Sequence, residues 1–196
     1  MSRTRVIRFL ALGMLISGLI TGGKGLWIGG KAVVAQILLK RAWHATLVSG
    51  KPVKPWPWMD SWPVARLDVP RLHRSAIVLE GESGQALAFG PAHLRATPMP
   101  GTPGLSVIAA HKNTQFDFLK DLRKGDKLTL QGIDGQTLIY EMVAARIVDY
   151  RNSGITGTSI GAESELALVT CYPFDQISFG GPLRYVVYAK LTNRNL

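Results

Sequence analysis

The stretch LALVTCYPF, residues 166–174, contains the only cysteine of this 196-residue chain. An apolar run with Val and Thr is typical of a buried β-strand, and the Tyr-Pro pair after it marks the exit into a loop. Cys171 is therefore either a small apolar side chain at the end of a core strand or a nucleophile at the strand's tip. The stretch alone favours burial, because free cysteines are among the most buried residues.

Similar β-type runs recur from residue 64 onward, separated by clusters of Gly, Pro, Asn and Asp. They are VARLDV (64–69), SAIVLE (75–80), LSVIAA (105–110), KLTLQ (127–131), TLIYEMVAARIVD (137–149), ELALVT (165–170) and LRYVVYAKL (183–191). One helix is predicted in residues 113–125, with Thr114 as its N-cap and Gly125 as its end. Seven or eight strands with one or two short helices predict a mostly β domain, either a closed barrel or a sandwich.

The net charge of +10 does not indicate a nucleic-acid-binding protein, because it is concentrated at the N-terminus. Residues 1–60 carry nine Lys or Arg against one acid, whereas residues 61–196 carry 14 against 12. The domain itself therefore lacks the basic stripe that nucleic acid requires. One cysteine excludes an intrachain disulfide, and no second thiol or paired His spacing indicates a zinc site.

Residues 1–30 predict an N-terminal signal anchor. Three arginines within the first eight residues precede an uncharged run, Phe9–Gly23, that is slightly short for a membrane span. If Lys24 snorkels, the segment from Phe9 to Gly30 is long enough to cross. A cleaved signal peptide is the alternative, although no A-x-A-like site follows the run. The basic start would stay cytoplasmic, and both interpretations export the domain.

Residues 31–61 connect this segment to the β domain, which we place at residues 62–196. Residues 32–47 predict an interfacial or continuing helix, followed by a linker rich in Pro and Trp. Trp27 and Trp43 are expected near a membrane interface. We expect Trp56, Trp58 and Trp62 to pack the linker onto the domain, with a carbohydrate-stacking platform as the alternative.

Export raises the question of why a lone thiol is kept, because an unpaired cysteine in an oxidising compartment risks mixed disulfides. Catalytic use needs a partner that forms or holds the thiolate. His111 ends an apolar strand run as Cys171 does, where side chains are exposed on a rigid scaffold. His93 lies among small residues and turn signals and could line a cleft. His44 lies in the N-terminal helix, and His73 lies among charges that indicate a surface position.

Arg184 is the third candidate, because it interrupts an otherwise apolar strand after Cys171. It shares a face of that predicted strand with Val186 and Tyr188. A strand–loop–strand hairpin would bring its guanidinium beside the thiol, where it could stabilise an oxyanion or hold a substrate backbone. From the residues alone, a surface-turn position for His111 and a rim position for Arg184 remain open.

Together these stretches resemble the sortases, a family of membrane-anchored cysteine transpeptidases. The resemblance runs from about residue 62 to residue 191 and centres on LVTC followed by LRYVV, which is similar to the family's Thr-Leu-x-Thr-Cys and Arg signature. Upstream, LAFGPAHLRATPMPGTPGLSVIAAHKNTQFDFLKDLRKGDKLTL is similar to its Gly-Pro-Gly-His, Gly-His and Gly-Asp block. TCYPF and GGPLRYVV resemble in particular the sortases of Gram-negative marine proteobacteria. Small residues replace the usual ones at Ala92, Ala110 and Ala167, which bears on substrate fit more than on chemistry.

The resemblance implies a closed sortase-type β-barrel of about eight strands, preceded by a membrane-anchor helix. It implies His111, Cys171 and Arg184 as the catalytic residues, with Thr170 and His93 in contact with substrate. In the implied mechanism the thiolate attacks a carbonyl of an LPXTG-like sorting signal, the histidine protonates the leaving amine and the arginine steadies the oxyanion. An amine then resolves the thioacyl-enzyme, and no metal or organic cofactor is needed.

The expected partners are a target protein with a sorting signal, an amine acceptor of the cell envelope and the membrane. The resemblance implies a single-pass protein of the cytoplasmic membrane with a periplasmic catalytic domain. Two alternatives stay open, namely an exported cysteine hydrolase of the same fold and a non-catalytic, membrane-tethered β-domain that binds a partner. A peptidoglycan L,D-transpeptidase is not indicated, because its Ser-x-Gly-Cys-x-Arg motif is absent.

Thiol alkylation separates a catalytic Cys171 from a buried one. We expect iodoacetamide to modify the folded protein at this residue, because a nucleophile must be reached by solvent. The modified peptide is measured by mass spectrometry before and after unfolding in urea. A thiol that reacts only after unfolding would support the buried, non-catalytic interpretation.

Overall fold

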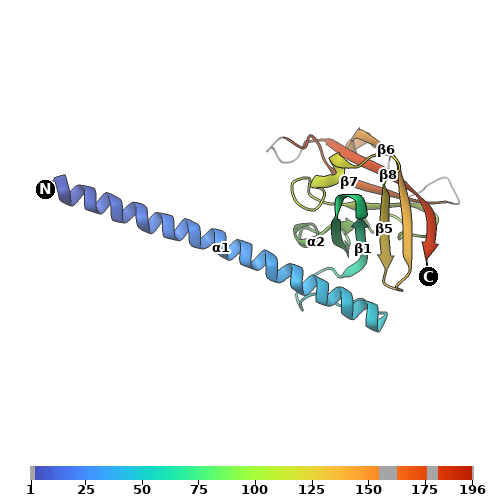
Figure 1. Cartoon of the computed structure of the whole chain (residues 1–196), viewed down its shortest axis with the longest axis horizontal. Coiled ribbons are helices and arrows are strands. Elements are labelled where there is room, and N and C mark those ends of the chain that lie inside the picture. Colours follow the sequence, from blue (N-terminus) through green and yellow to red (C-terminus); the bar gives the residue numbers. More distant parts are fainter. Residues whose placement is uncertain (1–2, 155–162, 176–180, 196) are drawn as a thin grey trace. The chain divides into compact units, whose positions relative to one another are not determined.

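The computed structural model (Figure 1) describes residues 3–154, 163–175 and 181–195. The chain divides into two compact units, with the boundary in the sequence between Leu38 and Leu39. The first unit consists of the N-terminal part of helix α1, which runs from Arg3 to Ser49. The second unit begins at Leu39 and contains the end of α1 and all the strands. Gly50 ends the helix in the left-handed region, with its N–H donating to the Thr46 carbonyl at 2.9 Å.

The predicted helix at residues 32–47 is confirmed as part of α1. The predicted anchor at residues 1–30 is also helical where the structure describes it, from residue 3. A hydropathy search of the described helices finds none that is both long and apolar enough to cross a membrane.

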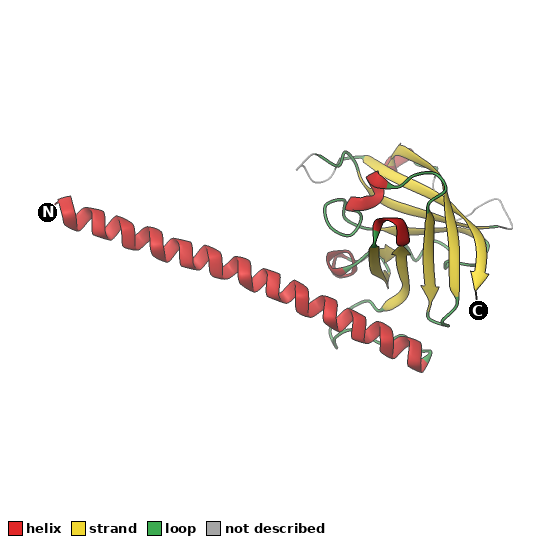
Figure 2. Cartoon of the chain, in the orientation of Figure 1, coloured by secondary structure: helices red, strands yellow, loops and turns green. Residues whose placement is uncertain are grey.

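The strands, drawn in yellow in Figure 2, close into one barrel. Their order is β1-β2-β3-β4-β7-β8-β6-β5. The strands are β1 Pro63–Val69, β2 Arg74–Glu80, β3 Ala92–His93, β4 Gly104–Ala109, β5 Lys127–Gly132, β6 Thr137–Asp149, β7 Ser164–Cys171 and β8 Leu183–Asn195. Six of the seven predicted β-type runs lie wholly in these strands, and the run at residues 105–110 extends one residue past β4. The strand pairing closes on itself, so the closed barrel is confirmed and the sandwich is excluded. Sequence reasoning missed β3, because two residues carry no alternating pattern.

The helical segments of the barrel unit are short: α2 Gly84–Phe89, η1 Pro70–Leu72, η2 Asp117–Asp121 and η3 Tyr150–Asn152. The helix predicted at residues 113–125 is the 3-10 helix η2 alone, and Thr114 does not cap it. The Thr114 hydroxyl instead donates to the neighbouring Gln115 side chain. Three apolar side chains of this region, Phe116, Leu119 and Leu122, are buried and lie three residues apart, which is the repeat of a 3-10 helix.

The barrel interior is filled by alternate residues of the strands. On β7 the side chains of Leu166 and Leu168 face the interior, and on β8 those of Val187 and Ala189 do so. The long strands β6 and β8 pair from Asp149 back to Thr137 with two register shifts. Such bulges bend a strand and increase its twist, which helps a sheet of long strands to close on itself.

Polar side chains join the strands at the end of the barrel where β7 begins. Tyr140 is fully buried, and its hydroxyl accepts the backbone N–H of Gly101 at 2.8 Å and lies 2.9 Å from the Ser164 hydroxyl. Burial raises the pKa of Tyr140, so its phenol stays protonated and can donate. The Arg194 guanidinium also donates to the Gly101 carbonyl, so neutral and charged groups together join the strands at this end.

The linker tryptophans differ in their environments. Trp56 packs edge-on against Phe89 at 4.9 Å, and Trp62 packs against the barrel core with the Arg95 guanidinium 5.7 Å from its ring. Trp58 is 76% exposed, so the prediction that it packs the linker was wrong. Trp43 is buried, which contradicts its expected place at a membrane interface.

Leu168→Ala should destabilise the barrel by about 2–5 kcal/mol, because Leu168 is fully buried in the interior and the substitution leaves a cavity. Urea unfolding of the full chain, followed by fluorescence, measures this loss. The control is Ile147→Ala on β6, where the side chain is 49% exposed and less than about 1 kcal/mol should be lost. Equal losses in the two variants would contradict the assigned interior.

Candidate active site

Cys171 and Arg184 are brought together by the pairing of β7 with β8. They are direct cross-strand partners in this antiparallel pair. Directly opposite residues on antiparallel strands point to the same face, with Cβ atoms about 4.5–5.5 Å apart. The predicted hairpin is therefore confirmed, although residues 176–180 of its loop lie outside the described part of the chain.

His111 is brought to the same place by the parallel pairing of β4 with β7. The last pair of that ladder is Ala109 with Val169, and the Ala110 N–H then donates to the Val169 carbonyl at 3.1 Å. His111 follows the last β4 residue of this ladder by two positions, as Cys171 follows Val169 on β7, so both residues lie at the same end of the barrel. The three residues that we expected to be catalytic thus lie at the same end of the barrel, at the exits of β4 and β7 and the start of β8.

Thr170 fixes this arrangement from the inside. Its side chain is buried, and its hydroxyl donates to the Ala110 carbonyl at 2.7 Å. This bond joins the residue before Cys171 to the residue before His111. The structure thus places Thr170 on the inner side, where it supports both exits; the predicted contact with substrate is not supported by this orientation.

The site lies on the outer face of the sheet. Cys171 and Arg184 follow the alternation of Ala167 and Val186, which belong to a cluster outside the barrel interior. His111 is exposed and Cys171 is partly exposed. Cys171 is thus not among the buried core residues, and its interpretation as a filler of the core does not fit.

Arg184 is held at the start of β8 by three contacts. Its Nη1 donates to the carbonyls of Gly181 at 2.6 Å and Leu183 at 2.9 Å, and its guanidinium carbon lies 4.8 Å from the centre of the Tyr150 ring. The neighbouring Asp149 has its pKa lowered to about 2, chiefly by the side-chain hydrogen bond from Arg151. The carboxylate near Arg184 is therefore already paired.

The segment after Cys171 contains an aromatic cluster that sequence reasoning did not single out. The rings of Tyr172, Phe174 and Tyr185 lie 5.2–6.4 Å apart in pairs. Tyr185 and Phe174 pack against the interior cluster, and burial raises the pKa of Tyr185. The sequence signal for this cluster is the Tyr-Pro-Phe run at residues 172–174. In the structure, the bond between Tyr172 and Pro173 is cis.

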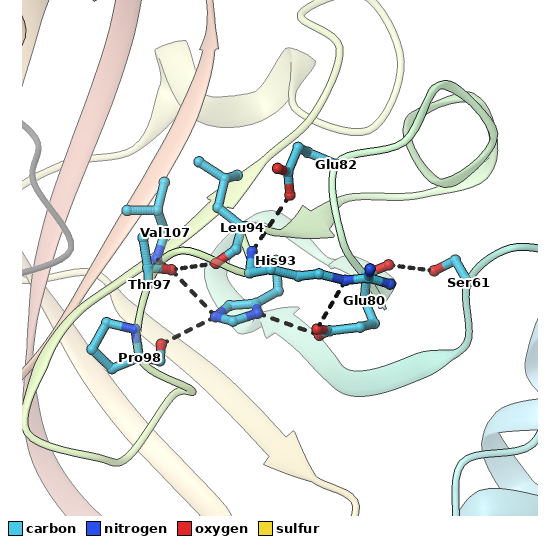
Figure 3. A network of polar contacts seen from close by, with 9 residues as sticks. Ser61, Glu80, Glu82, His93, Leu94, Thr97, Pro98 and Val107 are labelled. Atoms are coloured by element: carbon cyan, nitrogen blue, oxygen red, sulfur yellow. Dashed lines mark hydrogen bonds and ion pairs between the residues drawn. The ribbon is translucent and has the colours of Figure 1, made fainter.

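His93 lies in a buried network on the β2–β3 side of the barrel (Figure 3). The side chain is 1% exposed, and its Nε2 donates to the Pro98 carbonyl at 3.1 Å. Its Nδ1 lies 3.4 Å from Glu80 Oε2. The prediction that His93 lines a cleft was therefore wrong, because this ring joins β2 and β3 to the loop before β4.

Figure 3 also shows how the network continues to β4. The Thr97 hydroxyl donates to the Leu94 carbonyl at 2.7 Å and accepts the Val107 N–H at 3.1 Å. His73, in contrast, is exposed, as expected. Within the described ranges, no cluster of three His, Cys, Asp or Glu side chains that could hold a metal ion is present.

Comparison with known proteins identifies the family. The family model for the Sortase domain matches residues 67–192, so the chain belongs to the sortase family. Sortase D of Bacillus subtilis (strain 168) is 33% identical over 124 residues, which are 63% of this chain and 61% of that protein. The chain thus spans less than two thirds of the length of this relative. The predicted subgroup of Gram-negative marine proteobacteria stays a prediction.

Solved structures of sortases share the fold. The crystal structure of sortase C-1 from Actinomyces oris is 29% identical, with a TM-score of 0.59 over 67% of this chain and 75% of that one. A Sortase D5 transpeptidase from Clostridium perfringens is 20% identical, with a TM-score of 0.66 over 82% of this chain and 99% of that one. The eight-strand barrel is therefore a sortase fold.

Thr170→Val should lower the free energy of unfolding by about 1–3 kcal/mol, because the buried Ala110 carbonyl loses its hydroxyl partner while the shape is kept. Urea unfolding measures the change. Thr192→Val is the matched control, since the Thr192 hydroxyl donates to a strand carbonyl, that of Ile139, at an exposed position where water can replace it. Equal effects would contradict the role assigned to Thr170.

Proposed function

We propose that this chain is a cysteine transpeptidase that cleaves a C-terminal sorting signal and joins the target protein to an amine. The observation that supports this proposal most directly is the cross-strand pairing of Cys171 with Arg184, at the end of the barrel where His111 follows β4. Membership of the sortase family supports it. The related Clostridium perfringens protein is described as a transpeptidase.

The proposed reaction follows from the roles that these groups can take. The Cys171 thiolate adds to a peptide carbonyl, and the Arg184 donors stabilise the negative charge that develops on its oxygen. When the C–N bond breaks, protonated His111 supplies a proton to the leaving amine, and a thioester remains. An acceptor amine then attacks the thioester, loses a proton to His111 and receives the acyl group as a new amide. The C–S bond of the thioester breaks in this step, and the Cys171 thiolate is regenerated.

The exposed position of His111 suits a reaction in which one amine leaves the site and a second amine then enters it. The leaving and incoming amines must each approach the same imidazole, and a side chain at a strand exit can be reached from solvent. The substrate is proposed to be an LPXTG-like sequence, by analogy with the family. The acceptor is proposed to be an amine of the cell envelope.

We also propose that the N-terminal segment attaches the protein to the cytoplasmic membrane with the barrel on the periplasmic side. Basic residues before the uncharged run Phe9–Gly23 support this orientation. Extraction of membranes with carbonate at high pH tests attachment, and protease treatment of spheroplasts tests the side. Release of the full chain by carbonate, or protection of the barrel in intact spheroplasts, would contradict it.

Incubation of the purified full-length protein with a labelled LPXTG-type peptide tests transpeptidation. With a small amine present, we expect an amide product to replace the hydrolysis product, and Cys171→Ala should abolish both. Mass spectrometry should detect the acyl fragment on Cys171 in the wild-type protein. A product distribution that ignores the amine would favour the hydrolase of the same fold.

The non-catalytic alternative has its own test in His111→Ala and Arg184→Ala. Each variant should lose at least about 100-fold in kcat/KM, because a proton donor or an oxyanion donor contributes that much or more. The free energy of unfolding should change little, since His111 is exposed and Arg184 lies at the rim. A large loss of stability with no loss of a measurable reaction would support a structural role.

A further inference from the structure

We propose that Lys112 is a positioning residue that holds the His111 and Cys171 segments at a fixed spacing. This inference rests on the proposed function and adds a residue that the sequence comparison with sortases did not assign. The Lys112 Nζ donates to the Pro173 carbonyl at 2.6 Å. One end of this bond directly follows His111, and the other lies two residues after Cys171.

The bond lies where the regular ladder between the two segments has ended. Parallel pairing of β4 with β7 stops at Ala109, and the last backbone bond between the exits is Ala110 N–H to the Val169 carbonyl. Beyond it, one chain continues toward η2 and the other toward β8. The hydrogen bond from Lys112 to Pro173 connects the two chains again, one residue after His111 and two residues after Cys171.

The His111 segment and the Cys171 segment are each anchored by a further backbone hydrogen bond to another part of the chain. The Phe116 N–H donates to the His111 carbonyl at 3.1 Å, which anchors the backbone after β4. The Tyr172 N–H donates to the Leu183 carbonyl at 3.0 Å, which continues the β7–β8 pairing one residue beyond Cys171. With both segments anchored, a single cross-link between them is enough to set the spacing of the imidazole and the thiol.

The chemistry and surroundings of the bond suit a rigid tether. It joins an ammonium to a neutral carbonyl, and hydrogen bonds with one charged partner are stronger than neutral ones. Lys112 is only half-buried, but the carbonyl that it binds belongs to a segment fixed by the aromatic cluster of Tyr172, Phe174 and Tyr185. The tether therefore ends on a packed segment rather than on a free loop.

Lys112→Met removes the donor and keeps the length of the side chain. We expect kcat for acyl transfer to fall about 10- to 100-fold with KM changed less than about threefold, because the reacting groups are misplaced while substrate contacts remain. Lys112→Arg should recover most of the rate, since it keeps a charged donor. The control is Lys124→Met, which removes an exposed lysine of the same connection and should leave kcat unchanged.

The outcomes separate this proposal from the proposed function. If the wild-type protein transfers the acyl group and Lys112→Met matches Lys124→Met, or if Lys112→Arg is as impaired as Lys112→Met, the positioning role is overturned while the function stands. If the wild-type protein transfers nothing, the proposed function fails. The tether is then tested by hydrogen exchange at the Tyr172 and Phe174 amides, which should speed up in Lys112→Met alone. Unchanged exchange would overturn it.

Discussion

The hydrogen-bond ladder of β7 is the constraint on which the candidate site depends. This strand pairs in parallel with β4 on one side and antiparallel with β8 on the other. Because register fixes both the neighbour and the face of every residue, one strand sets the positions of His111 and Arg184 relative to Cys171. The buried hydroxyl of Thr170 secures the end of that ladder, and Lys112 joins the chains beyond it.

The alternation of side chains on β7 and β8 separates stability from chemistry. Inward residues such as Leu168 and Val187 fill the interior, and the aromatic cluster around Tyr185 packs at that end of the barrel. Outward residues carry the thiol and the guanidinium. A reactive group can therefore stand at a rigid strand end without creating an unpaired polar group in the core. At the other end of β7, Tyr140 and Ser164 bond to each other, so the two ends of the strand are fixed by different means.

The predictions that failed have physical reasons in common. Thr114 fits a capping pattern, but burial of apolar residues three apart favours a 3-10 helix that begins after it. His93 fits a loop pattern, but its ring bonds to a carbonyl inside the barrel wall. Trp43 fits a membrane interface, but it packs within the barrel unit. In each case the local sequence pattern was present, but the conformation or burial of the residue was decided by contacts that this pattern does not include.

The sequence by itself determined the seven main strands, the sortase resemblance and the three candidate residues, because alternation and short motifs are local properties of the chain. It also placed Cys171 and Arg184 on one hairpin. Only the tertiary structure decided that β4 lies in parallel beside β7, so that the chain leaves both strands for His111 and Cys171 at the same end of the barrel. It likewise decided that the thiol faces outward and that Lys112 reaches Pro173 across the two exits. These features depend on strand order and barrel closure, and no local pattern specifies which distant strand becomes a neighbour.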